Sequence, residues 1–299
     1  MFGGGGGFEF QFEDDGGMPN FGGGGGGGGG FPGHGDFFGG RSGGHKQRNH
    51  PELFPKNNDH GIAPLGKAKF PDSTSKFLWL VIFYSNDDAQ CQHAKSTLEQ
   101  LSGKTNGAFK IGAVNCKRNK SETSFCKQNG VDLNDLPAFG MVVDGQVSLL
   151  ETSSIPNAKQ LYDFAIDHFP TYTIQNINHP QHLEERLQQA ILNDDKKVGA
   201  ILLITDKYKT SSLYLSLSYQ FRQHFVFGES RGKNLSLGKQ FNVETYPTLC
   251  AIIKQKDNSF KIELTTNLKR ESIEKWLTRL VGKPTKSNEK SKRKRSRRN

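Results

Sequence analysis

Buried-strand and helical patterns alternate between residues 76 and 169, and this alternation is the feature that most restricts the fold. Residues 76–84 form a continuous apolar and aromatic run, which is typical of a strand buried on both faces. A helical pattern follows in residues 87–104, with Asp87 or Asp88 available to cap its first turn. A strand, a short helix, a hairpin and a closing helix are then expected at residues 109–115, 121–128, 138–143 with 147–150, and 157–169. This order predicts an α/β domain with helices packed on a central sheet.

The same order of elements recurs in residues 171–281. Its buried strand is residues 197–205, and its hairpin turns at residues 256–258. The other elements are expected as strands at 171–174, 224–227, 248–253 and 259–263, and as helices at 179–193, 211–221, 234–241 and 268–281. We therefore predict two tandem α/β domains of one kind, residues 60–170 and 171–282, each with a mixed sheet flanked by helices.

A proline precedes a strand at the matching place in each domain. Pro137 follows Leu136 in the first domain, and Pro247 follows Thr245 and Tyr246 in the second. Proline at a strand's first residue removes no ladder hydrogen bond, so either one alone needs no special explanation. Together with the element order, however, the segment KQFNVETYPTL resembles the F-x-V-x-x-Y-P-T segment of thioredoxin-fold proteins. The resemblance implies a thioredoxin fold, a cis bond before the proline, and a client-binding groove beside these five residues.

Two compositionally biased segments flank the domains. Residues 1–44 hold 22 of the 35 glycines and eight of the 22 phenylalanines, so residues 1–59 are expected to be a disordered segment and linker. Residues 283–299 carry nine Lys or Arg against one Glu, so most of the net charge of +10 belongs to this tail. The tail fits a solubilising segment, a nuclear-import signal, or a patch for RNA or acidic surfaces. Because it has no aromatic residue for base stacking, nucleic-acid binding is not expected.

The chain shows no membrane or secretion signal in its sequence. No apolar run approaches the roughly 18 residues that a membrane-spanning helix needs. Met1 is followed by glycines rather than by a basic segment and an apolar core, so no signal peptide is visible.

The first predicted helix begins with a degenerate redox motif. In redox-active thioredoxin-fold proteins it opens with F-Y-A-P-W-C-G-H-C-K, and here the segment is FYSNDDAQCQHAK. Cys91 and His93 match the motif, but Ala94 stands where the second cysteine belongs and three extra residues precede Cys91. Cys91 and His93 are therefore the candidate catalytic residues.

A lone Cys91 limits the chemistry that this motif supports. A thiolate near a helix N-terminus is stabilised by the helix dipole, and a neighbouring His93 adds to that effect. Cys91 would then form a mixed disulfide with a client, but no second thiol stands at position 94 to resolve it. The alternatives are a vestigial motif with a packing cysteine, which we favour, and a single-cysteine disulfide isomerase.

Cys116 and Cys126 lie ten residues apart, at the end of a predicted strand and within the next helix. Endoplasmic-reticulum members of the disulfide-isomerase family often carry a structural disulfide in this place, and closing such a loop contributes about 2–3 kcal/mol. The alternative is a pair of free buried thiols. Cys250 lies in a predicted buried strand, so the second domain is expected to be redox-inert. Neither a clustered metal-ligand set nor a phosphate-binding loop is present, and no cofactor or metal is expected.

The glycine blocks separated by single phenylalanines look like the Gly/Phe-rich region that follows the J domain in DnaJ proteins. With its two thioredoxin-like domains, the chain resembles DnaJ-family proteins of the endoplasmic reticulum that carry such domains C-terminally. The His-Pro-Asp loop of a J domain is absent, and His50-Pro51-Glu52 is interpreted as a coincidence. We therefore expect Met1 to be an internal methionine of a truncated gene model.

This resemblance implies a non-catalytic co-chaperone or folding factor in the lumen of the endoplasmic reticulum. Its thioredoxin-like domains would bind unfolded client polypeptides, and an upstream J domain would engage an Hsp70. One alternative is a thiol-disulfide oxidoreductase that acts through Cys91. Another is a nuclear or RNA-associated protein that acts through the basic tail, located in the nucleus or cytoplasm.

Overall fold

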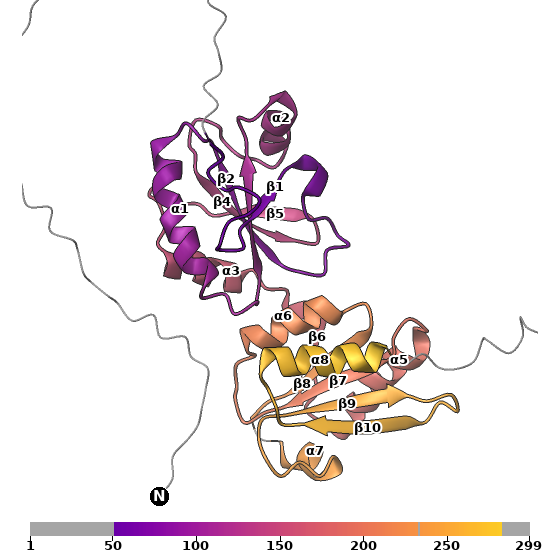
Figure 1. Ribbon diagram of the computed structural model, residues 1–299. Helices are drawn as coiled ribbons and strands as arrows, with labels where there is room; N and C mark the ends of the chain where they lie inside the picture. Colours follow the sequence, from indigo (N-terminus) through magenta and orange to yellow (C-terminus); the bar gives the residue numbers. More distant parts are fainter. Residues whose placement is uncertain (1–50, 233, 283–299) are drawn as a thin grey trace, which may run out of the picture. The chain divides into compact units, whose positions relative to one another are not determined.

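The computed structural model describes residues 51–232 and 234–282, drawn in colour in Figure 1. The predictions for the Gly/Phe-rich segment up to residue 50 and for the basic tail lie outside these residues. The described part contains two five-stranded sheets.

The first sheet has the strand order β1-β3-β2-β4-β5. Its strands are β1 (Ala63–Leu65), β2 (Trp79–Tyr84), β3 (Lys110–Asn115), β4 (Ala138–Val143) and β5 (Gln146–Leu149). The β1 and β2 strands run parallel to β3, whereas β4 runs antiparallel to β2 and β5 runs antiparallel to β4. Its helices are α1 (Ala89–Ser102), α2 (Lys120–Gln128), α3 (Ala158–Asp167) and the 3-10 turn η1 (Lys67–Lys69). The apolar run predicted as a buried strand is β2, whose last five residues are all buried.

The second sheet has the order β10-β9-β7-β8-β6, whose strands are labelled in Figure 1. It repeats the first sheet with the same pattern of parallel and antiparallel neighbours. Its strands are β6 (Ile174–Asn176), β7 (Gly199–Ile204), β8 (Phe225–Ser230), β9 (Thr248–Lys254) and β10 (Phe260–Thr265). Its helical segments are η2 (Thr171–Thr173), α4 (Pro180–His182), the π-helical η3 (Leu183–Gln188), α5 (Gln189–Asn193), α6 (Ser212–Phe221), α7 (Leu235–Gln240) and α8 (Arg270–Val281).

Successive residues of β7 enter two different core clusters. Ile201 and Leu203 pack with α6 and α8, whereas Leu202 and Ile204 pack with the helices of the opposite face. This alternation is the two-residue period of a strand buried on both sides. The predicted fold class, two tandem thioredoxin-like α/β units, is confirmed; the domain limits at 60, 170 and 282 stay predictions.

Two elements of the fold were not predicted, and one strand was predicted in the wrong place. The strand β1 and the turn η1 were not predicted, because β1 is three residues long and contains Pro64. Residues 171–174 were expected as a strand, but Thr171–Thr173 is a 3-10 turn and the strand begins at Ile174. Thr173 Oγ1 donates to the carbonyl of Pro170 at 2.9 Å, which closes a local turn instead of a ladder.

The strand β8 runs three residues beyond its predicted end. Its last residues, Gly228, Glu229 and Ser230, have the composition of a turn. They stay in the sheet because they pair with β7, and Gly228 and Glu229 pair with β6 as well. Gly228 also lies against Ile177 and Leu187, whose side-chain carbons would be about 3.0 Å from a β-carbon there. A glycine inside a strand commonly marks such a close approach.

Candidate functional site

The loop between β2 and α1 forms the candidate site of the first domain. Asp88 caps α1, and its carboxylate accepts hydrogen bonds from the backbone N–H groups of Gln90 at 2.9 Å and Cys91 at 3.0 Å. Of the two predicted caps, Asp88 is therefore the one used. The extra residues before Cys91 lie in this loop and its cap, and Cys91 becomes the third residue of the helix.

The side chain of Cys91 is fully buried under the first turn of α1. Its sulfur accepts a hydrogen bond from the backbone N–H of Ser85 at 3.4 Å. The pKa of the thiol is raised to about 12, chiefly by burial and also by the carboxylate of Asp88, while the Ser85 N–H and Lys117 act in the opposite direction. The expected lowering of this pKa by the helix dipole is thus outweighed by desolvation.

His93 does not share the environment of Cys91. Its side chain is exposed, whereas Cys91 and Ala94 face the core. Two residues along an α-helix correspond to a rotation of about 200°, so His93 lies on the opposite face of α1. The support of the Cys91 thiolate by His93 therefore stays a prediction that this arrangement does not favour.

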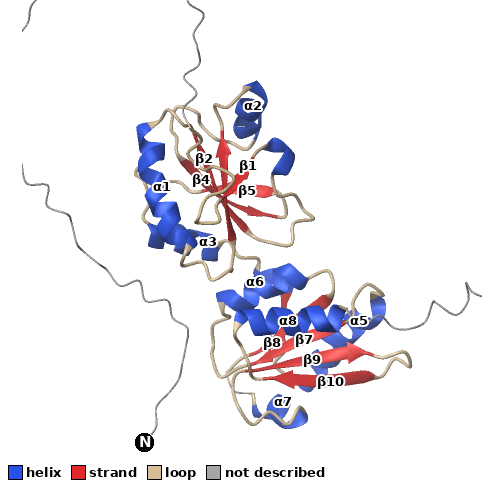
Figure 2. Ribbon diagram, in the orientation of Figure 1, coloured by secondary structure: helices blue, strands red, loops and turns tan. Residues whose placement is uncertain are grey.

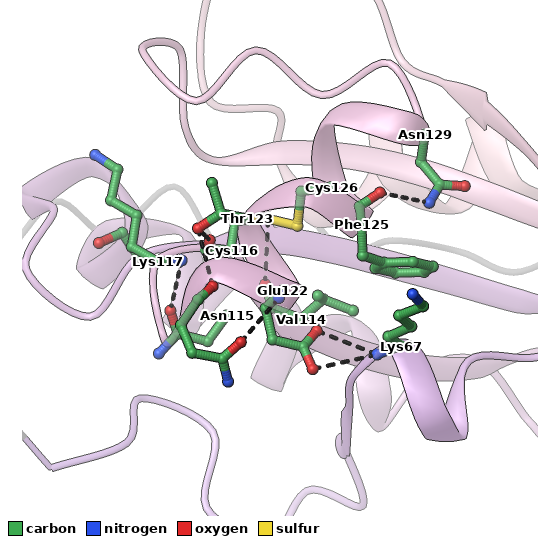
Figure 3. The surroundings of a disulfide bond; sticks show 12 residues. Lys67, Val114, Asn115, Cys116, Lys117, Glu122, Thr123, Phe125, Cys126 and Asn129 are labelled. Carbon is green, nitrogen blue, oxygen red and sulfur yellow. Dashed lines mark hydrogen bonds between the residues drawn. A yellow bond between two sulfur atoms is a disulfide. The ribbon is translucent and has the colours of Figure 1, made fainter.

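The sulfurs of Cys116 and Cys126 are joined in a disulfide, with their α-carbons 5.8 Å apart (Figure 3). Both residues are buried, and the bond fastens α2 to the end of β3. Thr123 Oγ1 supports the same connection by donating to the carbonyl of Cys116 at 2.8 Å. The backbone N–H of Val131 donates to the carbonyl of Cys126 at 3.1 Å. In this state neither sulfur is a free thiol that resolves a bond to Cys91.

Both predicted proline sites have cis bonds, at Leu136-Pro137 and Tyr246-Pro247. Of the five residues assigned to a client groove, only Leu136 is buried in the core. Pro137, Tyr246 and Pro247 are half-buried and Thr245 is exposed, with the Tyr246 ring against Gly238 of α7. Their role in client binding stays a prediction.

A tyrosine occupies the corresponding cysteine position in the second domain. Ser211 caps α6 and accepts from the N–H of Tyr214, just as Asp88 accepts from that of Cys91. The Tyr214 hydroxyl lies 2.9 Å from the carbonyl of Ile201 and 2.6 Å from that of Gly228, within donating distance of both β7 and β8. Burial raises the pKa of this phenol well above its usual range. Tyr214 was not predicted as a site residue, although its position three residues after Ser211, at the start of the predicted helix, matches that of Cys91 after Asp88.

The segment just before the first domain covers the carboxyl ends of β2 and β3. The Glu52 carboxylate accepts from Tyr84 at 2.8 Å and from Arg118 Nε at 3.0 Å. Partial burial raises the pKa of Glu52, but the hydrogen bonds from Arg118 and Tyr84 outweigh it and lower the pKa overall. Leu53 and Phe54 are buried, with Phe54 packed edge-on against Tyr84 at 5.1 Å. Residues 51–59, which the sequence placed in the disordered linker, therefore pack onto the domain.

Metal-ligating side chains do not gather in groups of three or more within residues 51–232 and 234–282. In the same part of the chain, every helix is too short or too polar to cross a membrane.

The curated proteins that share sequence with this chain include the following two. A Dictyostelium discoideum protein, assigned provisionally by its name to the protein disulfide-isomerases, is 26% identical over 182 residues, covering 61% of this chain and 43% of that protein. The DnaJ protein ERDJ3A of Oryza sativa subsp. japonica is 25% identical over 180 residues, covering 57% and 28%. The chain thus matches less than half the length of either relative. No protein-family model matches it.

Among solved structures, form II of ERdj5 matches this chain at 14% identity and a TM-score of 0.44, covering 74% of this chain and 30% of that chain. The zinc-bound form of human ERp44 matches at 12% identity and a TM-score of 0.33, covering 73% and 57%. The Trx4 domain of ERdj5 matches at 19% identity and a TM-score of 0.32, covering 37% and 97%. The sequence match to DnaJ protein ERDJ3A, together with the two sheets of this chain, confirms the predicted likeness to DnaJ-type proteins with thioredoxin-like domains.

Proposed function

We propose that this chain is a non-catalytic protein-folding factor whose thioredoxin-like domains bind unfolded client polypeptides. The observation that carries the proposal is the state of Cys91. Its thiol is buried, and burial raises its pKa to about 12, which keeps the thiol protonated at neutral pH. Because the thiolate is the nucleophile in disulfide exchange, this site is poorly suited to catalysis.

The same proposal extends to a DnaJ-type system in the endoplasmic reticulum. The likeness to DnaJ protein ERDJ3A supports work with an Hsp70 through a J domain. The disulfide between Cys116 and Cys126 fits an oxidising compartment, because such bonds persist mainly in secretory compartments and outside the cell.

Client binding is tested by aggregation of heat-unfolded citrate synthase, followed by light scattering. Equimolar protein is expected to suppress the scattering by at least half, and the Cys91→Ala variant is expected to do so equally well. No suppression at equimolar amounts would contradict the proposal.

Catalysis through Cys91 is tested in the reduction of insulin by dithiothreitol. The protein is expected to accelerate insulin precipitation no more than an equal amount of its Cys91→Ser variant. Turnover that disappears in Cys91→Ser would replace the non-catalytic function with a single-cysteine oxidoreductase.

A further inference from the structure

The strand β10 has one free edge within the described part of the chain. It is the last strand in its sheet, as Figure 2 shows, and pairs only with β9, from Phe260 opposite Lys254 to Thr265 opposite Leu249. An edge strand presents a row of unpaired backbone N–H and C=O groups on its outer side. Such a row accepts an extended polypeptide as an additional strand.

One face of β10 carries an exposed apolar strip. Phe260, Ile262 and Leu264 alternate along the strand, and Phe260 packs against the core on the side of the sheet opposite α6 and α8. Ile262 and Leu264 are 41% and 42% exposed. Single exposed apolar residues are ordinary, but two that are two positions apart on an edge strand form a surface that the side chains of an added strand cover.

The other face of β10 carries a surplus of positive charge. The Glu263 carboxylate accepts from Lys261 at 2.9 Å and from Arg279 of α8 at 2.7 Å. Glu263 is only 17% exposed, whereas Lys261 and Arg279 are 54% and 49% exposed. Two cations therefore share one carboxylate and still face solvent. A carboxylate on an added strand gains attraction here, and a cation is repelled.

We propose that the outer edge of β10 binds an extended segment of an unfolded polypeptide in which apolar and acidic residues alternate. The apolar residues of the segment cover Ile262 and Leu264, and its acidic residues lie beside Lys261. A second copy of the chain is a poorer occupant, because its β10 would bring the same surplus positive charge. This inference rests on the proposed client binding and specifies where a client docks and which clients are preferred.

The experiment measures the binding of two fluorescein-labelled peptides, VEVEVEVE and VKVKVKVK, to the full chain by fluorescence anisotropy. The glutamate peptide is expected to bind at least tenfold more tightly than the lysine peptide, and to slow amide hydrogen exchange in residues 260–265. Ile262→Thr with Leu264→Thr is expected to weaken its binding about tenfold. Lys261→Glu, which leaves the apolar strip intact, is expected to abolish or reverse the preference for glutamate.

The matched control is Val147→Thr with Leu149→Thr on β5, which is the corresponding edge strand of the first sheet. This variant is expected to bind the glutamate peptide like the wild type. Equal affinity for both peptides, or equal losses in the β5 and β10 variants, would overturn the proposal.

Two further outcomes would assign the edge to another occupant. Dimerisation that is lost in the Ile262→Thr, Leu264→Thr variant would assign it to a second copy. Tenfold tighter peptide binding after deletion of residues 1–50 would assign it to residues 8–13 (FEFQFE), which show the same alternation. If citrate synthase is bound equally by the wild type and the β10 variants, only this inference fails; if it is not bound at all, the proposed function fails.

Discussion

Cys91 and Tyr214 occupy corresponding positions in the two domains but make different contacts with the core. Each is the third residue of a helix and donates its backbone N–H to the capping side chain, Asp88 or Ser211. The small thiol is covered by its loop, whereas the larger phenol reaches the carbonyls of two strands. In both domains desolvation keeps the group in its neutral form. In both domains, the third residue of this helix is therefore a buried packing residue.

The close approach of Tyr246 to Gly238 predicts that a β-carbon at position 238 destabilises the protein. A β-carbon at position 238 would clash with the Tyr246 hydroxyl oxygen, although the ring carbon that bears it would be 3.5 Å away, an ordinary contact. Gly238→Ala is therefore expected to lower the free energy of unfolding by about 1–3 kcal/mol, even though alanine is the better helix former. Urea unfolding followed by circular dichroism measures the change.

A double variant separates this clash from other effects of the substitution. Tyr246→Phe removes the oxygen, so Gly238→Ala is expected to cost much less in that background than in the wild type. If Gly238→Ala stabilises the protein, as helix propensity alone would have it, the clash does not control this site.

At the scale of elements, the disulfide is the covalent connection between β3 and α2. Replacing Cys116 and Cys126 together by alanine releases a loop whose ends are ten residues apart, and is expected to lower the free energy of unfolding by about 2–3 kcal/mol. Dithiothreitol is expected to produce the same loss in the wild type during urea unfolding. The Cys250→Ala variant, in which the bond is intact, serves as the control and should remain sensitive to dithiothreitol. An unfolding midpoint that dithiothreitol does not move would contradict this assignment.

The ion pairs of Glu263 connect β10 to α8 and make stability depend on pH. The hydrogen bonds from Lys261 and Arg279 lower the pKa of Glu263 from 4.5 to about 2. A lowered carboxyl pKa contributes stability that is present above the unfolded pKa and is lost as pH falls through the folded value. As pH falls from 4.5 to 2, Glu263 is protonated and its ion pairs are lost, so the free energy of unfolding of the wild type is expected to fall by about 1 kcal/mol more than that of Glu263→Gln. The difference is small because water screens the half-exposed cations. Urea unfolding at several pH values tests this, with Glu271→Gln on the exposed side of α8 as control; equal slopes in all three proteins would refute it.

An element could be predicted from the sequence where its local residue pattern and its tertiary contacts favour the same structure. The apolar run of β2 follows directly from residue type, whereas spacing narrowed the helix cap to Asp87 or Asp88 and the structure selects Asp88. The resemblance pointed to the proline bonds and to the pairing of Cys116 with Cys126. A packed Cys91 was the interpretation favoured from the sequence, but its hydrogen bond from the backbone N–H of Ser85 depends on how the loop packs against α1. The role of Glu52 was missed for a similar reason: its partners Tyr84 and Arg118 are 32 and 66 residues away in sequence.

For the whole molecule, charge separates the two domains from the tail. Residues 283–299 carry a net charge of +8, and residues 1–282 carry only +2. If polyanions bind this protein, the tail should therefore control that binding, and the affinity should fall steeply with salt because each contact releases counterions. The attraction is expected to vanish between about 0.05 and 0.3 M salt. Client binding, which we assign to the domains, should change little.

Deleting residues 283–299 tests this separation of roles directly. The truncated chain is expected to lose its low-salt binding of labelled polyuridylate in anisotropy titrations, because stacking platforms are absent from the tail and only charge is available. Suppression of citrate synthase aggregation is expected to be the same with and without the tail, because a client contacts backbone edges and apolar side chains that the deletion leaves in place. The same deletion with the 17 residues replaced by a glycine and serine segment controls for chain length. Polyuridylate binding that persists at 0.3 M salt would contradict a purely electrostatic role of the tail. Client binding that disappears with the tail would mean that the tail, and not the pair of thioredoxin-like domains, is the principal binding element of this chain.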